Sequence, residues 1–217
     1  MKKLLDGIVE FRRTARPSYR EKFAKLALGQ SPDCLFFACS DSRVVPNLFA
    51  STEPGDLFVV RNLGNLVPPC QPSGVAVTDR SEGAAVEFAL NLLGVRDIVV
   101  CGHSECGAMR AMLANDLPPA SPNLSEWLGV GRSAVDRLDS ESLSGQGLAP
   151  HNRLSQLNVL QQLENLRTYP VVRDRLASGN LRLNAWWFDL TRAEVLAFDN
   201  DSGRFSPIGV GPEGSEG

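Results

Sequence analysis

This sequence has few histidines and cysteines and no large excess of either charge. Each of these features excludes some classes of function. The 217 residues include 2 histidines and 5 cysteines, and 22 Lys plus Arg oppose 25 Asp plus Glu, which gives a formal charge of −3. Without a basic run, a nucleic-acid partner is disfavoured, because phosphate binding needs clustered cations. An odd cysteine count in a chain of this length disfavours a disulfide framework. We therefore expect some thiols to bind a metal or act as nucleophiles.

Long hydrophobic runs are also lacking. No stretch reaches the roughly 18 apolar residues of a transmembrane helix, and the first residues mix charged with apolar positions unlike a cleavable signal. These features predict a cytoplasmic protein that binds no membrane. Hydrophobic residues make up 43% and charged residues 22% of the chain, which is typical of a globular protein. The length suits a single α/β domain over residues 1–217.

Short apolar runs alternate with an amphipathic segment in the middle of the chain. Strands are predicted at residues 34–38, 56–61 and 97–102, and a helix at 81–93 that is capped by its serine and ends at Gly94. This order predicts an α/β fold with a mostly parallel central sheet and flanking helices. In such sheets the functional groups gather at the carboxyl ends of the strands.

The two ends of the chain have other patterns. Residues 1–28 carry apolar positions spaced for one or two helices, with Pro17 opening the second, and predict an N-terminal helical arm. Residues 181–188 and 194–198 predict a hairpin that adds an antiparallel edge strand. Residues 202–217, rich in Gly, Ser and Pro, predict a flexible tail.

The remaining segments complete the same single domain. Helices are predicted at residues 105–113, at 152–166 and in a short piece ending at Ala177. Loops are predicted at residues 62–78 and 117–122, which are rich in Pro and Gly. No internal repeat and no second domain are indicated.

Cys39, His103 and Cys106 carry the groups most suited to a metal. Cys39 follows the first predicted strand, and the His103-x-x-Cys106 pair follows the third. If these strands are neighbours in a parallel sheet, both loops emerge at one edge. Thiolate and imidazole together select zinc over magnesium or calcium. Three protein ligands leave the fourth position open, as in catalytic zinc sites, and predict one zinc per chain.

Asp41 and Arg43 lie two and four residues beyond Cys39. A carboxylate beside a zinc-bound water can accept its proton, orient it or occupy the open position, and a guanidinium would keep that carboxylate ionised. On these residues alone, a structural zinc site or three unrelated buried residues have about even weight with a catalytic site. By the same standard, Asp41 and Arg43 would form only a loop ion pair.

Four sequence blocks resemble the β-class carbonic anhydrases: CSDSRV at 39–44, PGDLFVVRNLGNLVPP at 54–69, EGAAVEFAL at 82–90 and GHSECGAM at 102–109. The resemblance covers nearly the whole chain. It implies a zinc lyase, carbonate dehydratase, in which zinc-bound hydroxide hydrates carbon dioxide reversibly to bicarbonate and a proton. It also implies Cys39, His103 and Cys106 as zinc ligands, with Asp41 and Arg43 as the catalytic dyad.

The same resemblance implies a substrate pocket and an assembly. The substrate-binding residues would be Gln30, Val44, Phe58, Leu63 and Phe88, although the plant pattern has a tyrosine where Phe88 stands. Family members form dimers in which the N-terminal arm wraps the partner and glutamine and aromatic groups reach across to the zinc. A homodimer or a dimer of dimers is therefore expected, with residues 1–28 as the dimerisation arm.

The resemblance also distinguishes two subtypes. In the bicarbonate-sensitive subtype, a tryptophan stands three residues before the first zinc cysteine, and a tyrosine near the C-terminal hairpin joins an arginine in a regulatory pocket. Phe36 and Phe188 take the first two places here, while Arg61 remains. Because two donors are lost and Gln30 matches the plant-type glutamine, the plant-like, constitutively open subtype is favoured.

Two other functions stay open at this point. The same zinc site would serve a carbon disulfide or carbonyl sulfide hydrolase, and a non-catalytic zinc scaffold or redox sensor would also use it. Outside the site, Cys34 and Cys101 are expected as buried hydrophobic residues. Cys70 is expected as an exposed thiol, and His151 as a surface residue with a minor prospect as a proton shuttle. A nucleotide site is disfavoured, because the order of a phosphate-binding glycine motif is missing.

Overall fold

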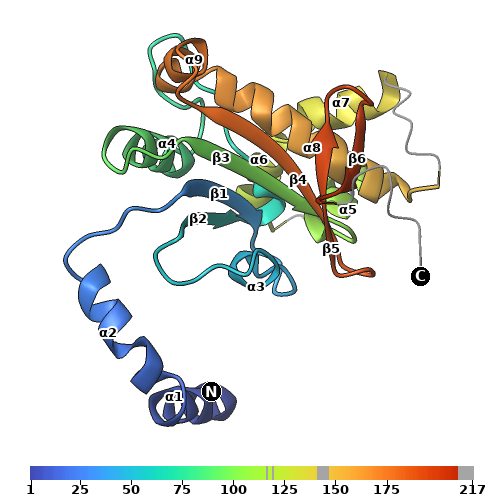
Figure 1. Cartoon of the computed structure of the whole chain (residues 1–217). Coiled ribbons are helices and arrows are strands. Elements are labelled where there is room, and N and C mark those ends of the chain that lie inside the picture. The colour runs from blue at the N-terminus through green and yellow to red at the C-terminus, as the bar shows by residue number, and fades with distance from the viewer. Residues whose placement is uncertain (116, 119, 141–146, 210–217) are drawn as a thin grey trace.

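A six-stranded sheet forms the centre of the molecule (Figure 1). The computed structural model describes residues 1–115, 117–118, 120–140 and 147–209. The strands in chain order are β1 (Cys34–Cys39), β2 (Leu57–Asn62), β3 (Asp97–His103), β4 (Arg182–Asp189), β5 (Glu194–Asp199) and β6 (Arg204–Pro207). They lie in the order β2-β1-β3-β4-β5-β6, with parallel pairing from β2 to β4 and antiparallel pairing at β5 and β6. The predicted parallel sheet with an antiparallel edge is confirmed.

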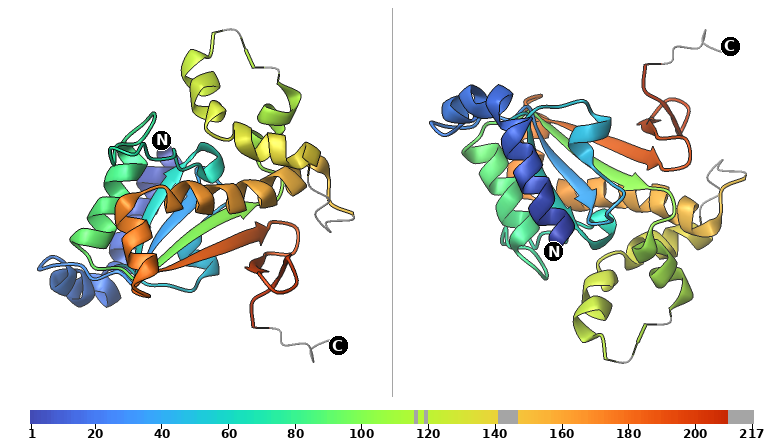
Figure 2. Two further views of the ribbon diagram at one scale, coloured as in Figure 1. Left: turned by 90° about the horizontal axis from the view of Figure 1, so that it is seen from above. Right: turned by 90° about the horizontal axis from the view of Figure 1, so that it is seen from below.

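Helices cover the sheet and extend from it. In chain order they are α1 (Lys2–Arg13), α2 (Arg16–Leu26), α3 (Pro46–Phe49), the 3₁₀ turn η1 (Leu63–Asn65), α4 (Ser81–Asn91), α5 (Gly107–Ala114), α6 (Pro122–Gly129), α7 (Arg132–Ser140), α8 (Pro150–Arg167) and α9 (Pro170–Ala177). Helices α4, α8 and α9 lie over one face of the sheet, and α3 lies at the other (Figures 1 and 2). The arm formed by α1 and α2 extends away from the sheet (Figure 1).

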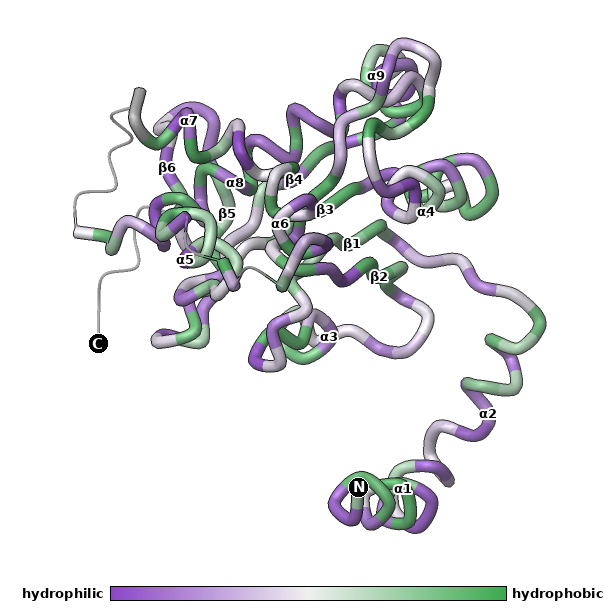
Figure 3. Tube along the Cα trace, turned by 180° about the vertical axis from the view of Figure 1, so that it is seen from behind, coloured by the Kyte–Doolittle hydropathy of each residue, from purple (hydrophilic) through white to green (hydrophobic). Residues whose placement is uncertain are grey.

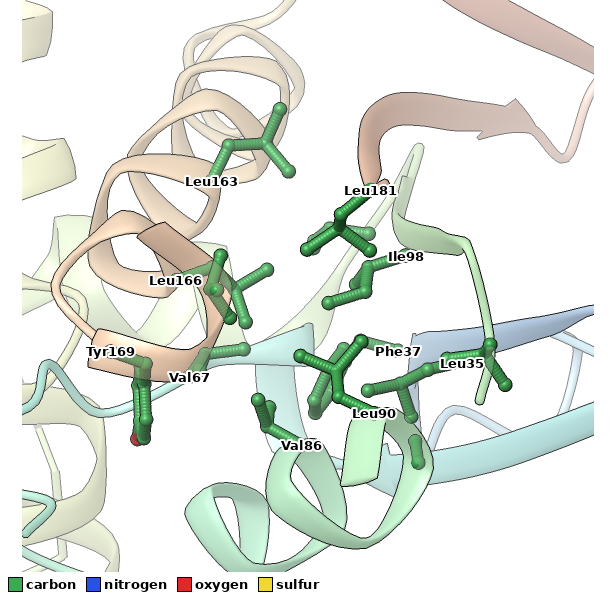
Figure 4. Packing of buried hydrophobic residues seen from close by; sticks show 14 of the residues in the cluster. Leu35, Phe37, Val67, Val86, Leu90, Ile98, Leu163, Leu166, Tyr169 and Leu181 are labelled. Carbon is green, nitrogen blue, oxygen red and sulfur yellow. The ribbon is translucent and has the colours of Figure 1, made fainter. Parts of the chain in front are cut away.

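Strand β1 is buried on both faces, which explains why its sequence is an unbroken apolar run. Leu35 and Phe37 point to the main core under α4 and α8, shown in Figure 4. Phe36 and Ala38 point to a smaller cluster on the opposite face. This alternation follows from the two-residue period of a strand. It leaves Cys39, at the end of β1, in a third buried cluster with Cys106.

A row of buried amides on α8 holds the segment that follows β2. Asn158 donates to the carbonyl of Gly64 over 3.0 Å, and Asn165 donates to the carbonyl of Val67 over 2.8 Å. Gln162 accepts from the Val67 N–H over 2.8 Å. Since these amides satisfy backbone groups that would otherwise be buried without partners, an irregular segment can lie inside the fold. The predicted loop at 62–78 is therefore fixed in place, with η1 at its start.

Several predicted boundaries are wrong in detail. Helix α4 begins at Ser81, but its cap is Arg80 without a side-chain hydrogen bond, and it ends at Asn91 rather than at Gly94. Gly94 follows shortly after with a φ of 68°.

Two segments predicted as unstructured contain regular structure. Pro122 begins α6 instead of ending a loop, because proline suits a first helical turn. The predicted tail contains β6, whose residues pair with β5. The final part of that tail, residues 210–217, lies outside the described residues.

The crossing of β3 and α8 requires glycine at position 102. A Cβ atom there would lie 2.7 Å from Cγ2 of Val159 and 3.2 Å from the carbonyl oxygen of Ser155. We expect Gly102→Ala to lower the free energy of unfolding by about 1–3 kcal/mol through overpacking. Denaturant titration measures this effect. Gly129→Ala is the matched control, since a Cβ atom there has no neighbour within 4 Å, and equal stability of the two variants would contradict the packing argument.

Candidate metal centre and active site

Two neighbouring strand ends bring the predicted metal-binding residues together. Cys39 is the last residue of β1 and His103 the last of β3, and these strands pair in parallel. Cys106 follows in the turn that leads into α5. One ligand atom from each of the three side chains lies within 4.8 Å of the others, and all three residues are buried. Three soft or borderline donors thus converge on one point at the carboxyl edge of the sheet.

The histidine ring is oriented as a metal ligand would be. Nδ1 of His103 lies 2.8 Å from the carbonyl oxygen of Ser104, and because a carbonyl only accepts, Nδ1 carries the proton. Nε2 therefore presents its lone pair, and this buried atom has no hydrogen-bond partner among the described residues. A buried nitrogen without a partner costs free energy that a metal ion would offset. Together with two cysteines, this donor set fits zinc.

The cysteines are already poised as ligands, because the thiolate is the form that binds metals. A hydrogen bond from the thiol of Cys106 lowers the pKa of Cys39, and the backbone N–H groups near Asp41 and Gly64 act in the same direction. The N–H of Gly64 lies 3.4 Å from the Cys39 sulfur. The same interaction between the two cysteines raises the pKa of Cys106. The contact between the two sulfur atoms thus favours loss of the first proton from the cysteine pair.

Asp41 and Arg43 form a bidentate ion pair beside this cluster. Nε of Arg43 donates to Oδ1 of Asp41 over 2.9 Å, and Nη2 donates to Oδ2 over 2.7 Å. Oδ2 also lies 3.9 Å from Nε2 of His103. Hydrogen bonds from the Arg43 guanidinium hold the pKa of Asp41 well below its usual range. The site therefore places a carboxylate that is ionised at neutral pH next to the three metal-binding atoms.

A pocket of about 270 Å³ opens onto Cys39 and Asp41. Its other walls are Leu63, Gly107, Ala108, Ala111, Leu124 and Leu128. Apart from the carboxylate and the thiol, these walls are apolar, which suits a small neutral molecule. Leu63 was expected at this pocket. The two leucines of α6 were not, because that helix was not predicted.

Helix α6 is fastened to the rim of the pocket by a tryptophan. Nε1 of Trp127 donates to the carbonyl oxygen of Leu63 over 2.8 Å. The hydrogen bond links α6 to η1, so that the walls from these two elements keep one spacing. In the sequence, a single tryptophan in a proline-rich stretch gave no indication of this contact.

Four other predicted substrate residues lie away from this pocket within the chain. Val44 is buried in the cluster around Phe36 and Phe188. Phe58 stacks on Phe88 at the edge strand β2, with ring centroids 5.7 Å apart. Gln30 is exposed in the connection between α2 and β1. Within a single chain, therefore, none of these four side chains lines the pocket at Cys39 and Asp41.

Two expectations about residues outside the cluster are wrong. His151 is partly buried and not freely exposed as expected, since its side chain is 14% exposed and Nε2 lies 3.1 Å from Oε1 of Glu105. Cys70 is buried rather than exposed, because its segment pairs with Ala76 and its N–H donates to Thr168. Cys34 and Cys101 are buried in strands, as expected.

Known proteins share both the sequence and the geometry. Residues 34–195 match the sequence model of the family described as carbonic anhydrase. A solved structure, described as that of the β-carbonic anhydrase CcaA, superposes with a TM-score of 0.88 at 39% identity and covers 95% of this chain and 98% of its own. The chain belongs to the β-carbonic anhydrase family.

Relatives of the same family match over most of their length. The carbonic anhydrase of Pseudomonas aeruginosa is 42% identical over 98% of this chain and 94% of its own, and that of Synechococcus elongatus is 41% identical over 93% and 73%. A structure from Sordaria macrospora, described as one of two tetrameric β-carbonic anhydrases, has a TM-score of 0.73 at 28% identity and covers 96% of both chains. Zinc-dependent hydration of carbon dioxide is the reaction of this family, and the cysteine–histidine cluster lies within the matched region.

Proposed function

We propose that this chain is a carbonic anhydrase that hydrates carbon dioxide reversibly to bicarbonate and a proton, with one zinc ion held by Cys39, His103 and Cys106. The observation that carries the proposal is the convergence of these three buried donors beside an ionised carboxylate and an apolar pocket. When bound, zinc would lower the pKa of a water molecule to about 7 and so supply a nucleophile at neutral pH.

The residues of the chain then divide the remaining work. Leu63, Leu124 and Leu128 offer an apolar surface for carbon dioxide next to Cys39. Oδ2 of Asp41 is placed to accept a hydrogen bond from the attacking water and so fix its orientation. Because the pKa of Asp41 is held so low, its carboxylate does not retain a proton at neutral pH. The proton therefore passes on to water and buffer.

A stopped-flow assay with a pH indicator tests this function. The purified full-length protein, loaded with zinc, is mixed with carbon dioxide, and hydrogen sulfide release is followed in parallel from carbon disulfide and carbonyl sulfide. We expect rapid acidification with carbon dioxide. Sulfide release without carbon dioxide hydration would replace the proposal with a sulfide-releasing hydrolase.

We also propose the constitutively open subtype. Phe188 stacks on Phe49 with ring centroids 4.7 Å apart, and Phe36 meets Trp186 edge-on at 5.8 Å. Aromatic rings therefore fill the region where the switching subtype needs polar donors. Arg61 is engaged as well, since it donates to the carbonyl oxygens of Cys39 and Asp41. These contacts favour an arginine that supports the end of β1 over one that binds bicarbonate.

The subtype predicts a particular pH dependence. The pKa of Asp41 is lowered in the folded protein. Its ion pair with Arg43 is therefore fully formed above the usual carboxylate pKa and is lost only when the pH falls through the lower, folded-state pKa. We expect hydration activity to decline gradually below neutral pH, with the Asp41–Arg43 pair intact in a crystal grown near pH 6. A steep loss of activity together with Asp41 on the metal at that pH would show the switching subtype instead.

The assembly is proposed from the arm. Helix α1 leaves Leu4, Leu5, Ile8 and Val9 at least half exposed, and the apolar positions along this helix are visible in Figure 3. A second copy of this chain would cover them in a dimer or a dimer of dimers. In such an assembly, the partner's copies of Gln30, Phe58 and Phe88, which are exposed or partly exposed, would complete the substrate pocket. Val44 would stay in the buried cluster of its own chain.

We expect Leu4→Glu combined with Ile8→Glu to dissociate the assembly and to lower the hydration rate, by about 10²-fold if pocket residues are displaced. Sedimentation velocity and the stopped-flow rate measure the two effects. Lys3→Glu is the control, since it changes the net charge by the same amount on the same helix. An unchanged molecular mass in the double variant would contradict the role of the arm.

A cytoplasmic location remains a prediction from composition. Among the described residues, no helix combines the length and the apolar character needed to cross a membrane.

A further inference from the structure

We propose that Asn152, in the first turn of α8, is a positioning residue for the Asp41–Arg43 pair and acts through Glu105. The inference rests on the proposed function, because it assigns a task within the same site. Asn152 is far from the family blocks in the sequence and touches neither Asp41 nor Arg43 in any hydrogen bond among the described residues. Its influence would travel through the backbone of the turn between His103 and Cys106.

Glu105 has a backbone conformation that needs support. Its φ of 59° lies in the left-handed region, which is unfavourable for a residue with a Cβ atom. Asn152 supplies two hydrogen bonds to this one residue. Oδ1 accepts from the Glu105 N–H over 2.7 Å, and Nδ2 donates to Oε1 of the Glu105 carboxylate over 3.0 Å. The amide thus grips the backbone and the side chain of Glu105 at once.

The carbonyl group of Glu105 continues the connection to the dyad. Nη2 of Arg43 donates to this oxygen over 3.1 Å, and the same Nη2 donates to Oδ2 of Asp41 over 2.7 Å. If the 105 peptide rotates, Arg43 loses one of the two acceptors that fix its outer nitrogen. Asp41 would then be held less firmly beside Nε2 of His103, and the geometry at the reacting water would spread.

The carboxylate of Glu105 has two further partners, from two different elements. Arg110 of α5 forms an ion pair with Oε2, and Nε2 of His151 lies 3.1 Å from Oε1. Arg110 is half exposed, so its contribution is screened by solvent. Asn152 is buried, with 8% of its surface exposed. Water therefore does not readily replace its two hydrogen bonds. Of the three partners, Asn152 is the one that holds both the backbone N–H and the carboxylate of Glu105.

An exchange of amide and carboxylate tests the proposal. Asn152→Asp keeps the acceptor for the Glu105 N–H but sets a carboxylate against a carboxylate. Adding Glu105→Gln in the same chain places an amide at position 105. The carboxylate at position 152 can then accept from both the backbone N–H and the side-chain amide of residue 105, so that both hydrogen bonds are restored. We expect kcat of Asn152→Asp to fall about 10- to 100-fold, as for other groups that orient a metal site, with KM unchanged. The double variant should recover most of the lost kcat.

A spectroscopic readout separates positioning from general stability. In the cobalt-substituted protein, the visible bands report the metal's coordination, and we expect them to change in Asn152→Asp and to return in the double variant. Asn184→Asp is the matched control, because Asn184 also donates to a carboxylate, Asp97, at the opposite edge of the sheet. That variant should keep the wild-type kcat and spectrum.

The outcomes distinguish the two proposals. Wild-type kcat and spectrum in Asn152→Asp would overturn the positioning role. So would a loss of rate that follows melting temperature and metal content and is not recovered by the second substitution, since that pattern describes a structural residue only. A wild-type protein without hydration activity would overturn the proposed function instead.

Discussion

Asp41→Asn is expected to lower kcat for carbon dioxide hydration about 10²- to 10⁴-fold, which is the range of a positioned acid–base group and corresponds to about 3–5 kcal/mol of transition-state stabilisation. The amide cannot be held by both prongs of Arg43, and it is a weaker acceptor than an ionised carboxylate. Zinc should remain bound, since Asp41 is not among the three clustered donors. Stopped-flow kinetics and metal analysis of the same sample measure both effects.

Asp97→Asn provides a closely matched control for this variant. Asp97 and Arg182 form a second two-pronged pair, with bonds of 2.8 and 2.6 Å, and its carboxyl likewise has a pKa lowered by hydrogen bonds from the arginine. Asp97 begins β3, whereas the metal-binding cluster lies at the end of that strand. The same chemical change there should leave kcat intact. If the two variants lost activity equally, Asp41 would have no specific role in the reaction.

Cys39→Ala is expected to lower the zinc affinity by more than about 100-fold. Loss of a group that only orients a metal ligand lowers affinity about 10- to 100-fold, and loss of a ligand itself should cost more. Activity should fall with the metal content. Only two of the three clustered donors would remain. Competition with a chromophoric chelator measures the affinity.

Cys34→Ala tests whether any buried thiol of β1 would have this effect. Cys34 begins the strand that Cys39 ends, and burial raises its pKa to about 11, so it stays a thiol. We expect a modest loss of stability and no loss of zinc. Retention of zinc by the Cys39 variant, or equal loss in both, would remove Cys39 from the ligand set.

The convergence of the metal-binding residues could be predicted on one condition, that the first and third predicted strands are neighbours, and the pairing of β1 with β3 meets it. Cys39 and His103 each end a short apolar run, and parallel neighbours present their ends at one edge. The burial of both faces of β1 could also be predicted, because its sequence is an unbroken apolar run. These features depend on local pattern and on a general rule of parallel sheets.

Other parts of the site depend on contacts between distant segments, which no local pattern encodes. Leu124 and Leu128 line the pocket from α6. This helix could not be predicted, because the proline at its first position is equally typical of a loop. Glu105 and Asn152 are 47 residues apart. The contact of His151 with Glu105, 46 residues earlier, is of the same kind and could not be predicted from the pattern of its own helix.

The two phenylalanines at the β2 edge show a different limit. Phe58 and Phe88 stack on each other and do not line the pocket at Cys39, so the role that the resemblance implies for them would need a second chain. A sequence motif does not indicate which subunit contributes a given residue to a pocket. The arm experiment separates these possibilities, because it disrupts the assembly without changing either phenylalanine.

The most direct test of the central claim is the hydration rate of the metal-depleted protein as zinc is added back. The account predicts a rate that rises in proportion to bound zinc and levels off at one ion per chain. A rate that does not depend on zinc, or a chain that binds one zinc and hydrates no carbon dioxide, would contradict it.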